Sequence, residues 1–460
     1  MSLDILFLIA LVGVLMVGYP VALTLGGLSI LFAGIGYGLG VFDPILLLAL
    51  PSRLFGVMTN AVLLSIPLFV VMGLVLERSN LAQDMLDAAA RLFANVRGGL
   101  PVSVMVVGAV MAASTGIVGA SVVTLGLLAL PGLLRNGVSP ALAGGTVAAA
   151  GTLGQIIPPS IVLIVLGDQM SNAWQKMQLD AGEFAPETVS VADLFAGALL
   201  PGLLIVALFV AYLIWQSPPS QVDDTAHTQT SRTRGEWLAL INAFVPPVAL
   251  IVAVLGSILF GIATPSEAAG IGAVGALLLA RKRLNRAALS SLLQDSVHLI
   301  SMIFLIVIGA SVFSLVFRGL GGEETIATML SQLPGGTYGA LIVVMLVIFA
   351  LGFFLDFLEI SLVVVPLVAP ALLAMPLADG AAMSPVWLGV LIAINLQTSF
   401  LTPPFGLSLF YLRSVAPAQL TTIALYRGVF PFIFLQVIAL ISVMAWPQLA
   451  TILPHSLYGQ

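Results

Sequence analysis

Long apolar runs, separated by short polar turns, extend along almost the whole chain. A helix needs about 20 mainly apolar residues to cross the hydrocarbon core of a bilayer. The runs are continuous rather than alternating, which argues against a transmembrane β-barrel. The pattern therefore predicts an all-α polytopic membrane protein. Its full spans are expected near 3–18, 21–40, 61–77, 140–167, 193–215, 238–260, 264–280, 298–317, 385–412 and 428–446.

Two further apolar regions, 99–135 and 337–375, do not fit as simple spans. Each is too long for one helix and carries small or polar residues at its centre, at Met111–Ser121 and at Gly352–Ser361. We expect both regions to form re-entrant helical hairpins that enter the membrane and return. Such backbone is tolerated at membrane depth only where protein or a water-filled cavity surrounds it.

Two predicted spans at matching places in the two halves carry Thr and Gln before consecutive prolines in their interior, within "GTLGQIIPPS" (Gly151–Ser160) and "NLQTSFLTPPFG" (Asn395–Gly406). Proline inside a helix costs about 3 kcal/mol, because it lacks an N–H and clashes with the preceding turn. Each span is therefore predicted to break. The break frees carbonyls that suit sodium, and it leaves a positive half-helix N-terminus that suits an anionic group.

The two halves of the chain repeat the same order of elements: two spans, an amphipathic connector, a third span, a hairpin, a broken span and a final span. The connectors are expected near 43–59 and 284–296. Five spans per half is an odd number, so the second half is inverted, which is the sequence sign of a secondary transporter. The predicted organisation is first-half scaffold 1–98, first-half transport elements 99–215, cytoplasmic linker 216–237, second-half scaffold 238–336 and second-half transport elements 337–460.

The charges of the loops orient this prediction. The segment Arg281–Arg286 holds four basic residues and no acidic one, which is typical of a cytoplasmic loop. The linker is then cytoplasmic and both termini are periplasmic. The N-terminus lacks the basic segment of a signal peptide and is interpreted as the first retained span.

Composition supports a membrane protein and excludes several chemistries. Hydrophobic residues make up 60% of the 460 residues and charged residues only 8%, against about 25% charged in soluble domains. The chain has no Cys and three scattered His, so it offers neither a thiolate site nor zinc-ligand spacing, and no transition metal is expected. It has no H-E-x-x-H, no G-x-S-x-G and no P-loop, so neither an enzyme nor ATP hydrolysis is predicted.

The candidate residues for binding sodium or substrate are the small, hydroxyl, amide and acidic residues at the hairpin centres and the breaks. Asp356 is the sharpest candidate, because a carboxylate at a helix centre in lipid costs about 2.5–3.5 kcal/mol. These candidates also have structural alternatives: hydroxyls bonded to the preceding turn, glycines that allow close helix packing, and Asp356 either paired with an arginine such as Arg318 or at an interfacial position. Glu267, at the start of the span 264–280, is predicted to cap that helix. The first-half candidates are Ser114, Thr115, Gly116, Gly119, Ser121, Gly151, Thr152, Gly154, Gln155 and Pro158; the second-half candidates are Gly352, Asp356, Glu359, Thr398, Ser399, Thr402 and Pro403.

Five motifs, spread along the chain, carry a family resemblance: "GTLGQIIPPSIVLIVLG", "FAGALLPGLL", "GIATPSEAAGIGAV", "LDFLEISLVVVP" and "LTPPFGLSLF". With them the sequence resembles the large membrane subunit of the tripartite ATP-independent periplasmic (TRAP) transporters over essentially its whole length. The hairpin "MAASTGIVGASVVTLGLLALP" is similar to the branch linked to mannitol, keto-acid and chloroaromatic uptake.

The resemblance implies an elevator mechanism in the bacterial inner membrane, in which both hairpins and both broken helices slide against a scaffold. Sodium would be the coupling ion, with no other cofactor. The implied partners are a small four-helix membrane subunit and a periplasmic binding protein that delivers an organic acid. The alternatives are a stand-alone sodium/dicarboxylate symporter of related architecture and, in a different class, an ion channel.

Overall fold

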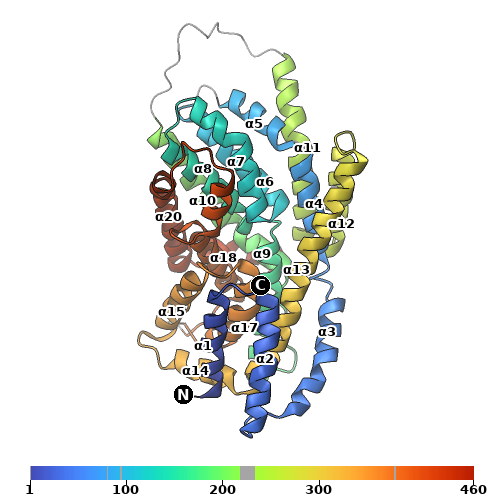
Figure 1. Cartoon of the computed structure of the whole chain (residues 1–460), viewed down its shortest axis with the longest axis vertical. Helices are drawn as coiled ribbons and strands as arrows, with labels where there is room; N and C mark the ends of the chain where they lie inside the picture. Colours follow the sequence, from blue (N-terminus) through green and yellow to red (C-terminus); the bar gives the residue numbers. More distant parts are fainter. Residues whose placement is uncertain (1, 80, 94–95, 218–233, 378–379, 460) are drawn as a thin grey trace.

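The computed structural model describes residues 2–79, 81–93, 96–217, 234–377 and 380–459, with the side chains of 114, 115 and 234–239 outside that description. Within these ranges the regular structure is entirely helical (Figure 1). The predicted linker 216–237 lies almost wholly outside the described residues. The first half contains α1 (Leu3–Met16), α2 (Val21–Gly38), η1 (Pro44–Ala49), α3 (Leu50–Thr59), α4 (Ser65–Arg78), α5 (Leu81–Leu92), α6 (Gly99–Thr115), α7 (Val118–Arg135), α8 (Pro140–Thr152), η2 (Leu153–Gln155), α9 (Ile161–Asp180) and α10 (Val191–Gln216).

The second half repeats this order with small differences. Six helices among the described residues are long and apolar enough to cross a membrane: α2, α7, α10, α11, α13 and α20. The second half contains α11 (Arg234–Leu259), α12 (Pro265–Ala280), α13 (Arg286–Gly319), α14 (Gly322–Ser331), α15 (Gly336–Leu351), α16 (Phe357–Glu359), η3 (Ile360–Val364), α17 (Val365–Leu373), α18 (Pro385–Leu401), α19 (Leu407–Val415), α20 (Thr422–Ala445) and α21 (Gln448–Tyr458).

Helices form at every predicted span, but several predicted boundaries were wrong, including the start of the last span, which was predicted at 428 whereas α20 begins at Thr422. The first broken span was predicted to end at 167, whereas α9 continues to Asp180. Met170 and Ala173 are buried, and α9 packs against α17, so tertiary contacts extend the helix into the predicted acidic loop. The predicted second connector, 284–296, is not a separate element but the first part of the 34-residue α13.

The difference between the two connectors has a local cause. The first connector ends at Asn60, whose Oδ1 accepts a hydrogen bond from Val62 N at 2.8 Å and so caps the turn before α4. The second contains no such break between Asn285, which caps the start of α13, and Gly319. The sequence also did not predict α5, α14 or the C-terminal α21 as separate helices.

Contacts between the halves are reciprocal. The α4 helix packs against α12, and α13 packs against α2, so the third helix of each half pairs with the second helix of the other. A pseudo-two-fold relation between inverted repeats predicts this exchange. These helices form the part of the molecule that we call the scaffold. At the α2–α13 contact, a β-carbon at Gly309 would lie 2.5 Å from the Ala22 carbonyl oxygen, so the two backbones touch closely.

The helix cap predicted at Glu267 is confirmed. Thr264 Oγ1 accepts a hydrogen bond from Glu267 N at 3.3 Å, and Glu267 Oε2 accepts one from Thr264 N at 2.8 Å. This reciprocal capping box begins α12 and satisfies two N–H groups that a helix start would otherwise leave free.

Candidate functional site

Both predicted helix breaks are present. In the first half α8 ends at Thr152 and α9 begins at Ile161, with Pro158 and a cis peptide bond to Pro159 between them. In the second half α18 ends at Leu401 and α19 begins at Leu407, with a cis bond from Pro403 to Pro404 between them. The η2 turn of the first break contacts α18, so the two broken helices meet inside the molecule.

Each broken helix carries a buried glutamine before its proline pair, three residues before Pro158 in the first half and six residues before Pro403 in the second. Gln155 lies in η2 and Gln397 lies in α18, and neither side chain is exposed. Both the amide nitrogen and the amide oxygen of each residue lack a hydrogen-bond partner among the described residues. An unpaired buried polar group costs about 1–3 kcal/mol and calls for an explanation such as a bound ion, a water or a ligand.

The hydroxyl groups at the breaks donate to the preceding turn of their own helices. Thr152 Oγ1 donates to Ala149 O at 2.8 Å, and Ser399 Oγ donates to Leu396 O at 2.8 Å. These bonds match the structural alternative for hydroxyl residues, although each oxygen keeps lone pairs for a further contact. The same pattern holds for Thr398 and Thr402, which donate to Ile394 O and Thr398 O.

The first hairpin, α6–α7, turns at the first break. Gly116 has φ +61°, a left-handed conformation that favours glycine, and a β-carbon there would lie 3.2 Å from Ile161 N at the start of α9. The turn therefore lies directly against the break. Gly151 and Gly154 also pack closely on this hairpin, against Val122 and Ala112. Ser121 is buried in α7, whereas the side chains of Ser114 and Thr115 lie outside the described residues.

Each hairpin also packs on the broken helix of the other half. A β-carbon at Gly119 in α7 would lie 2.9 Å from the Tyr411 ring in α19, so the first hairpin packs on the second broken helix. The α17 helix of the second hairpin packs in turn on α9 of the first broken helix. The two hairpins (α6–α7 and α15–α17) and the two broken helices (α8–α9 and α18–α19) thus form one packed unit, which we call the hairpin unit.

The second hairpin turns at Asp356, against the second break. The Phe354 ring lies 5.3 Å from the Phe405 ring, centroid to centroid. Asp356 caps the short α16 helix: its Oδ1 accepts from Phe357 N at 2.7 Å, and Glu359 Oε2 accepts from Asp356 N at 3.0 Å. Within the described ranges no ion pair joins Asp356 to Arg318, because Arg318 pairs with Glu323 instead, at 3.0 Å.

Replacing Gly352 by alanine should loosen the second hairpin. A β-carbon there would lie 2.2 Å from Ser399 Oγ, so hairpin and broken helix must separate. We expect a loss of about 1–3 kcal/mol in the free energy of unfolding together with slower transport. Gly256→Ala in α11 is the control, because nothing lies within 4 Å of its β-carbon position. Equal thermal stability of the two variants would contradict the close contact.

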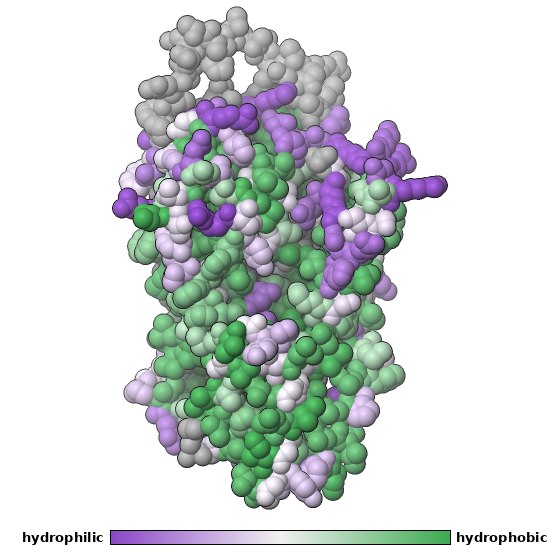
Figure 2. Space-filling model, in the orientation of Figure 1, coloured by the Kyte–Doolittle hydropathy of each residue, from purple (hydrophilic) through white to green (hydrophobic). Residues whose placement is uncertain are grey.

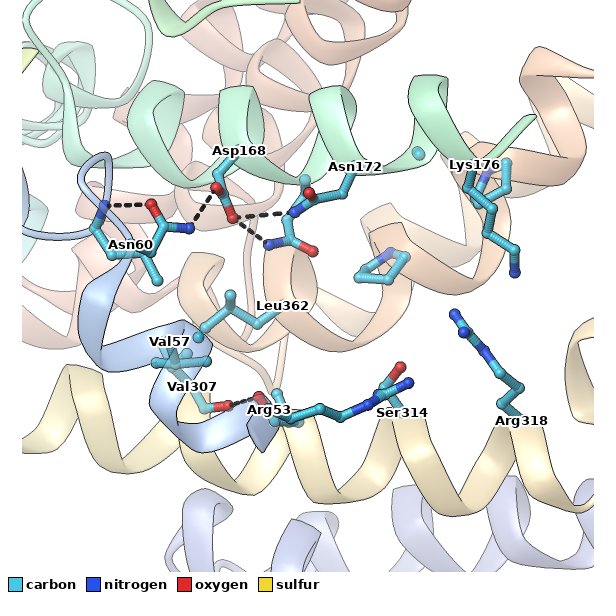
Figure 3. A pocket seen from close by; sticks show the side chains of 18 of the residues that line it. Arg53, Val57, Asn60, Asp168, Asn172, Lys176, Val307, Ser314, Arg318 and Leu362 are labelled. Atoms are coloured by element: carbon cyan, nitrogen blue, oxygen red, sulfur yellow. Dashed lines mark hydrogen bonds between the residues drawn. The ribbon is translucent and has the colours of Figure 1, made fainter. Parts of the chain in front are cut away.

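A polar cavity of about 490 Å³ separates the scaffold from the hairpin unit (Figure 3). One wall comes from the scaffold helix α13, together with α3, the turn at Asn60 and α14, and the other wall comes from α9, η3 and α17. Sequence reasoning did not place a site here. The charged and amide residues that line it are Arg53, Asn60, Asp168, Gln169, Asn172, Lys176, Arg318 and Glu323.

Most of these charges are already paired. Glu323 accepts from Lys176 Nζ at 2.5 Å and from Arg318 Nε at 3.0 Å. Asp168 accepts from the side-chain amides of Asn60, Gln169 and Asn172 at 2.9, 3.0 and 3.3 Å. The Lys176–Glu323 and Asn60–Asp168 contacts cross from the hairpin unit to the opposite wall, and the Asn60–Asp168 bond is drawn in Figure 3.

Only a weak signal for this cavity exists in the sequence. Arg53 is a single basic residue in an otherwise apolar connector, and Asp168 follows directly on a buried apolar run. Lys176 was assigned to a loop because the end of α9 was set too early. In the described part of the chain, no three His, Asp or Glu residues come together as a metal site would require.

Comparison with known proteins agrees with this architecture. Residues 8–449 match the family model described as "Tripartite ATP-independent periplasmic transporter, DctM component". The chain belongs to this family. The relatives of this DctM-family chain are named as transporter permeases rather than enzymes, so the protein is a multi-pass membrane transport subunit and not an enzyme.

Individual relatives cover nearly the whole DctM-family chain. The C4-dicarboxylate TRAP transporter large permease protein DctM of Pseudomonas aeruginosa is 29% identical, over 90% of this chain and 91% of its own. The ectoine TRAP transporter large permease protein TeaC of Halomonas elongata is 24% identical, over 96% and 97%. The solved YdaH transporter of Alcanivorax borkumensis has the same fold, with a TM-score of 0.62 over 98% of this chain and 100% of its own at 15% identity.

Proposed function

We propose that this permease subunit takes up an organic acid across the bacterial inner membrane, driven by a sodium gradient. The observation that carries the proposal is the pair of buried glutamines at the two facing breaks, neither of which has a partner among the described residues. Their amide oxygens, with the carbonyls that a broken helix frees, are ligands of the kind that sodium sites in such transporters use. The two sites are proposed at Ser114–Ser121 with Gly151–Gln155 and at Gly352–Asp356 with Thr398–Thr402.

An elevator mechanism fits the way the helices pack. The hairpins and broken helices of both halves contact one another across the repeat boundary, and the scaffold pairs are built from other helices. Polar contacts such as Lys176–Glu323 line the cavity between the two parts beside its apolar residues. We propose that the hairpin unit moves as one body against the scaffold.

A tripartite transporter requires a small membrane subunit and a periplasmic binding protein beside this subunit. We propose that both are separate chains and that the binding protein delivers the acid. The named substrates of the relatives differ, including C4-dicarboxylate and ectoine, so they do not fix the acid carried here. The mannitol, keto-acid and chloroaromatic branch stays a prediction from the first hairpin.

The orientation follows from the distribution of charge. Figure 2 shows hydrophilic side chains gathered at the upper end, where Figure 1 places the α12–α13 turn. There Arg283 donates to Asp84 at 2.5 Å and to Ser79 O at 3.0 Å, which joins this turn to the start of α5. We propose that this basic end is cytoplasmic. The N-terminus lies at the opposite end, beside α14, and is then periplasmic.

Uptake by reconstituted proteoliposomes tests the proposal. The complex of this chain with its small subunit should accumulate a labelled acid only with an inward sodium gradient and a loaded binding protein. The rate should rise with sodium more steeply than first order, since one ion site is proposed in each repeat. Full-rate uptake without a binding protein would favour a stand-alone symporter, and passive currents would favour a channel. Full-rate uptake driven by protons alone would contradict sodium coupling.

A further inference from the structure

Among the described residues, Arg53 is the one basic residue of the cavity between scaffold and hairpin unit that makes no ion pair. It lies on α3, is partly buried, and makes no hydrogen bond or ion pair within the described ranges. Figure 3 shows its side chain extending along α13 toward Ser314. A guanidinium carries five N–H donors in a planar fork that matches a carboxylate. Arg53 therefore offers an open binding group for an anion.

The two acidic residues of the cavity already accept hydrogen bonds from groups other than Arg53. Glu323 already accepts from Lys176 and Arg318, and Asp168 is held by three amide donors. Taken together, three basic and two acidic side chains line the cavity, which leaves a single positive charge. A ligand with one negative charge balances this set, whereas a dianion would leave a negative charge uncompensated in a partly buried site.

The rest of the lining suits a compact organic molecule. Leu362 and Pro366 of the hairpin unit and Val57 of α3 provide apolar surface, while Ser314 and Asn172 can bond to a hydroxyl or keto group. The volume of about 490 Å³ falls in the range of small-molecule sites, about 300–1,000 Å³. A second cavity of about 640 Å³ continues from Lys176 and Arg318 toward Ala374, so the site has space for approach.

We propose that this cavity is a substrate-binding site for a monocarboxylate, with Arg53 as the residue that binds its carboxylate. This inference rests on the proposed function as an organic-acid transporter. The two walls of the site belong to parts that are proposed to move relative to each other, so the site is complete only in the arrangement seen in this structure. Movement of the hairpin unit would separate Arg53 from Leu362 and so open the binding site.

The absence of cysteine from the chain allows a test that does not require the substrate to be known. Ser314→Cys places one thiol in the cavity of the purified complex with the small subunit. An anionic methanethiosulfonate reagent should label this thiol faster than a cationic one, by about fivefold, because an unpaired positive charge raises the local concentration of anions. Adding Arg53→Gln should remove the preference.

Arg286→Gln is the matched control, because Arg286 lies on the equivalent connector of the second half, is exposed and has no partner in the described ranges. It should leave the anionic preference unchanged. An unchanged preference in the Arg53→Gln protein, or equal labelling by both reagents in the parent, would overturn the role of Arg53. Thermal unfolding of each variant confirms that the protein being labelled is folded.

Protection from labelling tests the class of ligand. Lactate or benzoate should slow labelling of the thiol introduced by Ser314→Cys more than succinate does at the same concentration, and Arg53→Gln should abolish the protection. Stronger protection by succinate, or none by either monocarboxylate, would overturn the monocarboxylate assignment. These measurements need neither sodium nor a binding protein. If the labelling results fail while uptake remains driven by sodium, the cavity site alone is disproved. If the labelling results hold while uptake does not depend on sodium, the proposed coupling alone is disproved.

Discussion

Replacing Gln397 by leucine is expected to abolish sodium-driven uptake while leaving the free energy of unfolding unchanged or higher. The side-chain amide of Gln397 is fully buried at the second break and has no partner within the described part of the chain. Leucine removes a polar group whose burial without a partner costs about 1–3 kcal/mol, and it keeps a similar volume. If Gln397 served stability instead, Gln397→Leu would lower the free energy of unfolding. Uptake and thermal unfolding must therefore be measured on the same preparation.

Gln436 provides the control for this experiment. It is also fully buried, with both amide atoms lacking a partner in the described structure, but it lies in α20, outside the breaks and hairpins. Gln436→Leu should match Gln397→Leu in stability and retain uptake. Gln155→Leu should also lose uptake, because Gln155 is the buried glutamine of the first broken helix and its amide likewise has no partner among the described residues. Uptake at the wild-type rate in Gln397→Leu would remove this residue from the transport site.

Replacing Asp356 by asparagine should reduce uptake at limiting sodium about 10- to 100-fold, because a contact to a charged group contributes about 1.5–3 kcal/mol. Stability should change little. Asp356 caps α16 through its Oδ1, and asparagine is as good a helix N-cap as aspartate. The measurement is sodium-dependent uptake, with the sodium concentration for half-maximal rate expected to rise.

Asp356→Ala separates the cap from the charge. It should lose uptake as Asp356→Asn does and also lose about 0.5–2 kcal/mol of stability, because the hydrogen bond to Phe357 N disappears. If the Asp356→Asn protein kept the wild-type dependence of uptake on sodium, the role of Asp356 would be only to cap α16. Failed assembly of that variant would instead indicate a structural charge, an interpretation that Arg318 does not support because it pairs with Glu323.

The breaks and hairpins were predictable because their causes are local. Proline lacks an N–H and clashes with the preceding turn, which favours the breaks at Pro158 and Pro403. A proline pair alone does not end a helix, because Pro246 and Pro247 lie inside the continuous helix α11. Gly116 takes a left-handed turn that other residues rarely adopt, and Thr264 with Glu267 forms a capping box within four residues. The hydrogen bonds of Thr152 and Ser399 to the preceding turn are equally local, which is why the sequence could name them as an alternative.

The order of helices, the two breaks, the turns between the hairpin arms and the family were therefore predictable from the pattern of residues alone. How these parts meet depends on tertiary contacts. Helix α9 reaches Asp180 because it packs on α17, and the hairpins exchange partners between the halves because α7 packs on α19. Likewise, Arg53 and Lys176 line one cavity although they are far apart in the chain. These contacts depend on the shapes of surfaces distant in sequence, and a hydrophobic pattern specifies that a face is buried without specifying what buries it.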